Sequence, residues 1–535
     1  MKRVGALIVW VTINLVSGCR QKTDSEPISK AKSLTAGGTR IASGKAFDLR
    51  LSPDREIALY LKDALKPAVE GIPPQMVVGR LYRVALSSNR PADRSEREVA
   101  AGVTNLPGGY FVSADSKWLV AVDKYQASTQ SGGLVVAGLK NAEPSTRVAA
   151  SGVEQVILSP DSKWMAFINQ GQLMLGALPS GPFRPLVNQA VTGAFAPDSR
   201  RFYFKRSFGS GGGLYYTSTQ AGPSSGEKFT QLGEQVGDFS VSNDSCHVAF
   251  TVRSASPGIK GGYDLRLASE PRMTAVLKAV GAGVFSFSAD SKWFAFVEGQ
   301  KPELLGSLRV EPLSGGSPVE LGAKVSEAVF APDSSAIAYL EHFDIGARAG
   351  VLKVATLPER KPIWAGDRVP NFSWGSDGEY LAFLSRFLKP LYSVDLMLFR
   401  MKDRLPSKIQ PGVFGYGFGP ANRYLLYRTQ CVRNGRACNL FSSDLKNPKS
   451  TPEKWVEGVY SFKPSVSGDR VLVSYARTDS PLYDLASYQV TAKSVRTVDT
   501  DILLPAFPAN ESGSRVAYLE ENLSRQGVYL SEALP

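Results

Sequence analysis

Histidine is almost absent from this chain: His247 and His342 are the only two among its 535 residues. A catalytic triad or an imidazole general acid–base pair therefore has few possible members. A metal site at His342 would need additional ligands from other loops. We expect no metal and no cofactor, and we favour a protein that is not an enzyme.

Blocks of like charge are also missing from the sequence. Without a basic arm, we expect no binding of DNA or RNA. The 62 Lys and Arg residues against 49 Asp and Glu give a formal charge of +13, which favours acidic partners or anionic surfaces. The run Gly209–Gly213 precedes no helical pattern, so we expect a loop there rather than a phosphate-binding motif.

The N-terminus has no apolar run long enough to span a bilayer. The basic start Met1–Arg3 is followed by an apolar stretch, Val4–Val16, of signal-peptide length. The sequence Val16-Ser17-Gly18-Cys19 resembles a bacterial lipobox, although a plain secretory signal with an incidental Cys is the alternative. The resemblance implies that residues 1–18 are a signal peptide and that Cys19 carries a stable lipid anchor with more than one acyl chain.

The residue after Cys19 bears on the destination of the anchored protein. Arg20 stands where enteric bacteria place the Asp that marks retention in the inner membrane, so the resemblance implies an outer-membrane lipoprotein of the cell envelope. Residues 19–38 are polar and lack any period, and we expect a flexible tether.

A short phrase returns along the rest of the chain, as in Phe287-Ser-Ala-Asp290-Ser-Lys-Trp-Phe-Ala-Phe-Val297. A small polar turn leads into an apolar strand, and neighbouring copies such as Asp244 and Asp290 lie 46 positions apart. The anchor residues are Asp54, Asp115, Asp161, Asp198, Asp244, Asp290, Asp333 and Asp377, continued in altered form at Ala421, Ser467 and Ser512. A period in the mid-forties is typical of a four-stranded propeller blade.

The phrases Ser159–Lys163, Ala196–Ser199 and Ala331–Ser334 resemble the TolB-type β-propeller repeat. The resemblance implies an all-β propeller over nearly all of residues 40–535. Most copies place Ser where that family has Gly, which is retained at Gly378 and Gly468, and the α/β domain that precedes the TolB propeller is lacking.

The repeat count predicts about eleven four-stranded blades. Because single rings usually have four to eight blades, we expect two tandem rings, residues 39–320 and 321–535, with one oversized ring as the alternative. The segment Thr39–Ser43 is one strand in surplus, and the chain stops one strand short after Gly527–Ser531. We expect these two segments to pair and close the structure.

Two further patterns concern the turns and the cysteines. The repeated Asp is expected to cap its own turn rather than to bind a ligand. Cys431 and Cys438 flank Asn434-Gly435, which favours a two-residue hairpin and sets the two Cys opposite each other, so we expect a disulfide. Cys246 is left as a free thiol.

Long connections follow the second strand of several repeats and should share one face of a propeller. They are rich in basic residues, and binding residues concentrate on loops of a rigid scaffold. The candidate binding residues are Lys124, Lys205, Arg206, Arg253, Lys260, Arg348, Arg386, Lys389, Arg433 and Arg436. We expect a binding or scaffold module for an acidic envelope protein or an anionic glycan. The alternatives are a glycan-active hydrolase or lyase and a small-ligand sensor.

Overall fold

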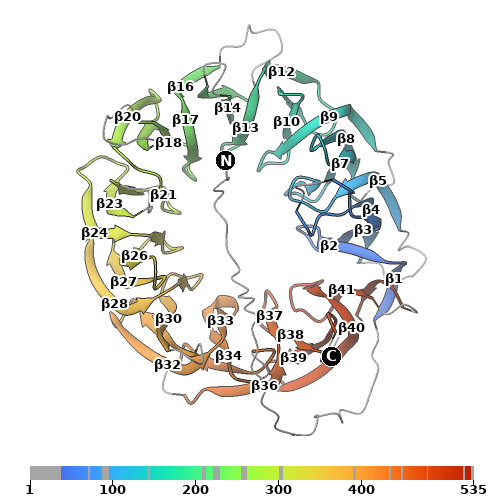
Figure 1. Cartoon of the computed structure of the whole chain (residues 1–535), viewed down its shortest axis with the longest axis vertical. Coiled ribbons are helices and arrows are strands. Elements are labelled where there is room, and N and C mark those ends of the chain that lie inside the picture. Colours follow the sequence, from blue (N-terminus) through green and yellow to red (C-terminus); the bar gives the residue numbers. More distant parts are fainter. Residues whose placement is uncertain are drawn as a thin grey trace. The chain divides into compact units, whose positions relative to one another are not determined.

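The structure is a computed structural model in which residues 36–535 form one compact unit. It describes residues 38–69, 73–86, 96–140, 145–207, 212–220, 229–254, 262–299, 305–388, 393–432, 435–447, 450–478, 480–521 and 525–531. Figure 1 shows the strands of this unit following one another around a ring, from blue β2 through green and yellow to red β41.

Among the described residues, seven sheets have four antiparallel strands in sequential order. The first three contain β2 (Ala46–Leu51), β3 (Ile57–Leu65), β4 (Val78–Ala85), β5 (Arg97–Thr104); β13 (Ala190–Phe195), β14 (Arg201–Arg206), β15 (Gly213–Ser218), β16 (Thr230–Glu234); and β17 (Val236–Val241), β18 (His247–Arg253), β19 (Tyr263–Ser269), β20 (Thr274–Ala279). The next two contain β21 (Phe285–Phe287), β22 (Trp293–Glu298), β23 (Gly306–Pro312), β24 (Val319–Val325); and β25 (Glu327–Phe330), β26 (Ala336–Asp344), β27 (Ala349–Thr356), β28 (Lys361–Val369). The last two contain β29 (Phe372–Trp374), β30 (Tyr380–Leu388), β31 (Ser393–Arg400), β32 (Leu405–Val413); and β33 (Gly415–Phe418), the 3-10 turn η3 (Pro420–Asn422), β34 (Tyr424–Val432), β35 (Ala437–Asp444), β36 (Glu453–Val459).

Two further sheets in the described ranges have seven strands each. One contains β6 (Tyr110–Val112), β7 (Trp118–Gln126), β8 (Ser131–Gly138), β9 (Thr146–Leu158), β10 (Trp164–Asn169), β11 (Gln172–Ala177) and β12 (Phe183–Val187). The other contains β37 (Ser461–Pro464), β38 (Arg470–Ala476), β39 (Tyr483–Gln489), β40 (Ser494–Pro508), β41 (Val516–Glu520), β42 (Gly527–Leu530) and β1 (Thr39–Ser43). Each of these sheets contains two copies of the repeat, joined by one long strand. In the first sheet this strand is β9, which pairs with β8, the third strand of one copy, and then with β10, the second strand of the next.

The expected number of sheets and rings was therefore wrong. Seven separate four-stranded blades are present in the described part of the chain rather than eleven, and the sheets belong to one ring rather than two. Position 320, where a boundary between rings was expected, lies inside β24, a hydrogen-bonded strand of its sheet. The alternative of a single ring agrees with the structure.

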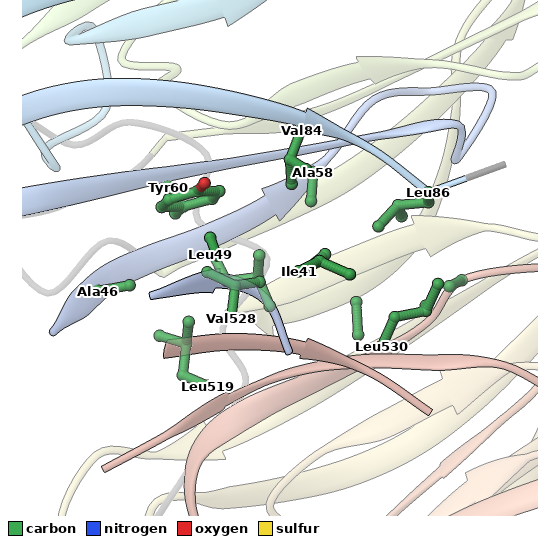
Figure 2. Packing of buried hydrophobic residues seen from close by; sticks show 13 residues of the cluster. Ile41, Ala46, Leu49, Ala58, Tyr60, Val84, Leu86, Leu519, Val528 and Leu530 are labelled. Carbon is green, nitrogen blue, oxygen red and sulfur yellow. The ribbon is translucent and has the colours of Figure 1, made fainter. Parts of the chain in front are cut away.

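The two ends of the described chain close the ring, as the sequence predicted. β1 pairs antiparallel with β42, with Thr39 opposite Leu530 and Ser43 opposite Gly527. The backbone N–H of Gly38 also donates to the hydroxyl of Tyr518 at 3.0 Å. Figure 2 shows Ile41 between the side chains of the first sheet and those of β42.

Hydrophobic side chains fill the space between successive sheets. An aromatic residue lies six positions after the anchor in nine of the eleven copies, and all nine are buried. Four of these rings are tyrosines with no exposed surface: Tyr60, Tyr339, Tyr427 and Tyr518. The small residue beside it is equally buried, as at Ala166, Ala249 and Ala338. A large ring next to a small residue lets neighbouring sheets interdigitate.

The turn motif itself is held by its own Ser and Asp side chains. In the copy at residues 288–293, the Ser288 hydroxyl donates to Asp290 Oδ1 at 2.7 Å and accepts the N–H of Trp293 at 3.0 Å. Asp290 Oδ1 also accepts the N–H of Lys292 at 3.1 Å. These contacts satisfy the backbone groups of the turn, so the repeated Asp has the capping role expected of it.

These contacts give the turn a pH dependence. Burial by itself raises the pKa of Asp290, but hydrogen bonds from Ser288 and Lys292 outweigh it and bring the pKa below the ordinary 3.8. Because the folded-state pKa is the lower one, the stabilisation is present above pH 3.8 and is lost as the pH falls through the folded value. As the pH is lowered from about 4 to about 2, we expect the melting temperature of Asp290→Asn to fall less than that of the wild type. Superimposable pH profiles of the variant and the wild type would contradict this.

Serines also connect each turn to the next around the ring. Six times, the hydroxyl of the Ser after the anchor accepts the backbone N–H of the preceding anchor Asp at 3.0–3.1 Å. We call these contacts the serine bridges, and their acceptors are Ser116, Ser162, Ser199, Ser245, Ser291 and Ser334. All six serines have φ between 55° and 63°, the left-handed region that favours Gly. The hydroxyl therefore explains why Ser stands where the repeat has Gly elsewhere.

Candidate functional site

The strand order gives the ring two unlike faces. Because neighbouring strands are antiparallel, the turn motifs between first and second strands lie at one end of every sheet, which we call the turn face. The hairpins between second and third strands lie at the opposite end, together with the links from each fourth strand to the next sheet. We call this end the loop face, and the predicted basic residues belong to it.

Some basic side chains near this face join neighbouring sheets. The ammonium of Lys205, at the end of β14, donates to the carbonyl of Gly237 in β17, and burial lowers the pKa of Lys205. Arg428 stands at the same repeat position in β34 and donates to the carbonyl of Tyr460 beside β37. Arg206 is half-buried, and its Nε atom is buried without a hydrogen-bond partner. Lys205 and Arg428 therefore stabilise the ring, and Arg206 is not freely exposed.

Four of the predicted binding residues are exposed on the loop face. They are Lys124, Arg253, Arg348 and Arg436. Within the described ranges, none of the four forms a salt bridge, and only the side chain of Arg436 has a hydrogen bond, from Nη2 to the carbonyl of Arg477 at 3.4 Å. Cations that lack an acidic partner keep their full charge available to a ligand.

The other predicted residues cannot be placed in the same way. Lys260, Lys389, Arg433 and Cys19 lie outside the described residues. Arg386 belongs to β30, and its side chain is not described.

The cysteine prediction is confirmed for the hairpin. Cys431 and Cys438 form a disulfide with Cα atoms 4.0 Å apart, and Val432 pairs with Ala437 as the Asn-Gly turn predicts. A bulge between Thr429 and Val432 accommodates one extra residue on the first strand. Cys246 is a free thiol of intermediate exposure.

The two histidines are far apart in the sequence and have ordinary surroundings. His247 Nδ1 lies 2.8 Å from the Ser269 hydroxyl, and burial lowers its pKa. His342 is exposed, with Nε2 3.8 Å from a carboxylate oxygen of Glu341. Among the described residues, no three His, Cys, Asp or Glu side chains gather as metal ligands, and no helix has the length and apolarity of a membrane span.

The two faces each carry a cavity in the described part of the chain. A cavity of 510 Å³ on the loop face is lined by Arg253 and Arg266, with Glu234 and Gln235 from the link between β16 and β17. A cavity of 720 Å³ on the turn face lies where the first and last repeats meet, and Arg55, Glu511 and Arg515 line it. Positive and negative side chains line both cavities, so neither one alone identifies a ligand.

Lys324 and Arg368 also lie on the loop face and were missed by the sequence reasoning. Both lie one residue before the end of a fourth strand, β24 or β28, whereas the prediction considered only the hairpins after second strands. A signal was present in the sequence, because each residue directly precedes a buried valine, Val325 or Val369, at the end of a fourth strand. The same position is Gly in several other repeats.

Comparisons with known proteins give no family for this chain. No protein-family model matches it, and no curated protein matches it either. A solved structure described as a eukaryotic initiation factor aligns with 73% of this chain and 95% of its own length, at 12% identity and a TM-score of 0.40. A tricorn protease aligns with 88% of this chain and 62% of its own length, at 10% identity and a TM-score of 0.26. At these identities and scores, neither likeness says what this chain binds or does.

Proposed function

We propose that this chain is a lipid-anchored β-propeller of the bacterial cell envelope that binds an acidic protein or an anionic glycan through its loop face. The repeats resemble those of the TolB type, and Cys19 follows a sequence that resembles a lipobox. The observation that carries the binding proposal is the set of exposed cations without acidic partners, Lys124, Arg253 and Arg348, presented by a ring whose sheets are packed against one another.

The anchor is tested by fractionation. We expect Cys19→Ser to move the protein from the membrane fraction to the soluble envelope fraction, because the lipid is the proposed source of membrane affinity. Immunoblotting of both fractions measures the shift. A variant that stays in the membrane fraction would rule out the anchor and leave the fold unaffected.

The loop face is tested by reversing charge. We expect Lys124→Glu, Arg253→Glu and Arg348→Glu combined to weaken salt-sensitive binding of acidic polymers, poly-L-glutamate and alginate, by at least about tenfold, since surface attraction between opposite charges weakens with both salt and charge removal. The matched control reverses three exposed lysines of the turn face, Lys117, Lys163 and Lys292, which changes the net charge equally. Equal losses in the two triple variants would mean that net charge alone matters.

A further inference from the structure

One position, at the place where a repeat passes into the next, has a left-handed backbone in ten repeats of the described chain. It always precedes a buried apolar residue, and the φ values lie between 50° and 80°. The residues at this position are Gly102, Gly152, Gln189, Gln235, Gly281, Lys324, Arg368, Gly412, Gly458 and Asp501. Half of them are glycine, the residue that adopts this conformation without strain.

Lys324 and Arg368 occupy this position in two successive repeats, one residue before the ends of β24 and β28. Their φ values are 50° and 52°, both side chains are exposed, and neither has a hydrogen bond or a salt bridge within the described ranges. A long side chain in the left-handed region is strained and gains no contact here that offsets the strain. Both cations are therefore exposed without an internal partner and can contact a ligand outside the chain.

The hairpin between β26 and β27 lies on the same face as these two residues, because neighbouring strands are antiparallel. It carries Arg348, which is also exposed and left-handed with φ of 50°, and Ile345, whose side chain is 52% exposed. Trp364 in β28 is 49% exposed, and its indole N–H donates to Asp367 at 3.0 Å, which directs the ring toward the end of β28 that holds Arg368. We call Lys324, Ile345, Arg348, Trp364 and Arg368 the β25–β28 patch.

The acidic side chains near this patch are already engaged. Glu341 is buried and pairs with Lys353 at 2.5 Å. Asp344 accepts the N–H groups of Gly346 and Ala347 at 2.8 and 3.1 Å. Asp367 accepts the indole N–H of Trp364. Glu341 is neutralised by Lys353, whereas Asp344 and Asp367 accept only neutral N–H groups and keep their charge. Among the described residues, none of the three carboxylates forms a salt bridge with Lys324, Arg348 or Arg368.

We propose that the β25–β28 patch is the docking site for an acidic protein. Ile345 and Trp364 act as apolar anchors, and Lys324, Arg348 and Arg368 contact carboxylates of the partner around them. Trp and Arg are among the residue types enriched in protein–protein hot spots. One Ile and one Trp give too little apolar area to hold a membrane surface. The inference rests on the proposed function, because it specifies which part of the loop face binds and what kind of partner it accepts.

The experiment compares glycine variants, because the sister repeats show that glycine fits this backbone. The probes are a glutamate–tyrosine copolymer as an acidic polypeptide with apolar side chains, alginate as an anionic glycan, and vesicles that contain phosphatidylglycerol. We expect Lys324→Gly with Arg368→Gly to weaken binding of the copolymer about tenfold, and the melting temperature to stay equal or to rise as strain is relieved. Arg404→Gly is the matched control, since Arg404 is exposed and left-handed with φ of 54° in the turn between β31 and β32 at the opposite end of the sheet.

The outcomes separate this proposal from the one on which it rests. Loss of copolymer binding in the double variant, with binding kept in Arg404→Gly, supports the patch. Unchanged copolymer binding in the double variant, together with a loss in the Lys124, Arg253 and Arg348 triple variant, overturns the patch and leaves the binding face in place. If alginate or vesicles bind more tightly than the copolymer, the proposal that the partner is a protein is overturned. A wild-type protein that binds none of the three probes overturns both proposals.

Discussion

A chain that lacks residues 38–43 is expected to lose on the order of 5 kcal/mol of its free energy of unfolding. This deletion removes β1, whose Ile41 and Ala42 are buried against the first and last sheets. It also uncovers Val528 and Leu530 and leaves the backbone edge of β42 unpaired. Thermal unfolding followed by circular dichroism measures the loss, and limited proteolysis should cut the C-terminal strands first.

A matched control separates ring closure from simple shortening of the chain. A synthetic peptide that spans residues 37–46 should restore part of the melting temperature of the truncated protein, because it can pair with β42 from outside. The same peptide with Ile41→Asp should restore none, since Ile41 is the side chain that it buries. An unchanged melting temperature in the truncated protein would show that β1 contributes little to the stability of the ring.

Replacing all six acceptors of the serine bridges is expected to have the second large effect. With Ala at positions 116, 162, 199, 245, 291 and 334, the buried hydroxyls are lost and the left-handed backbone keeps its strain. At about 1 kcal/mol for each hydrogen bond, the loss is on the order of 6 kcal/mol. The bridges lie in different turns, so the effects should add approximately.

Glycine at the same six positions provides the discriminating comparison. It removes the same hydroxyls, but each left-handed residue becomes less strained by about 1 kcal/mol, so most of the loss should disappear. Denaturant unfolding of the Ala and Gly sets measures both free energies under one condition. Equal destabilisation of the two sets would show that backbone strain at these serines is negligible, and no destabilisation in either set would show that the bridges do not stabilise the ring.

Local features of the fold could be predicted from the sequence because they depend on residues close together in the chain. The turn around Asp290 forms its hydrogen bonds within six residues, and the Asn-Gly hairpin brings Cys431 to Cys438. The pairing of Thr39–Ser43 with Gly527–Leu530 was predictable for a different reason. The N-terminal end of the repeat series had one strand in surplus, and the C-terminal end was one strand short.

Features that depend on the neighbouring sheet could not be predicted in the same way. β9 remains one strand through Gly152, since its residues find partners first in β8 and then in β10, and the sequence contains no mark of that continuity. Lys205 was expected to be a free cation, but its ammonium reaches a carbonyl of the next sheet. For Lys324 and Arg368 the sequence holds only the following valine as a signal, and their left-handed backbone is a property of the folded chain.

The pairing of β1 with β42 has a consequence for how the protein is made. A ring closed by β1 and β42 cannot be completed until β42 has been synthesised, because these two strands lie at opposite ends of the described chain. Until then β1 has no partner, and the first sheet has an uncovered side. A message truncated by an early stop codon would therefore yield a product in which β1 and the last completed sheet both lack a partner. Quality-control proteases can recognise either of these exposed edges.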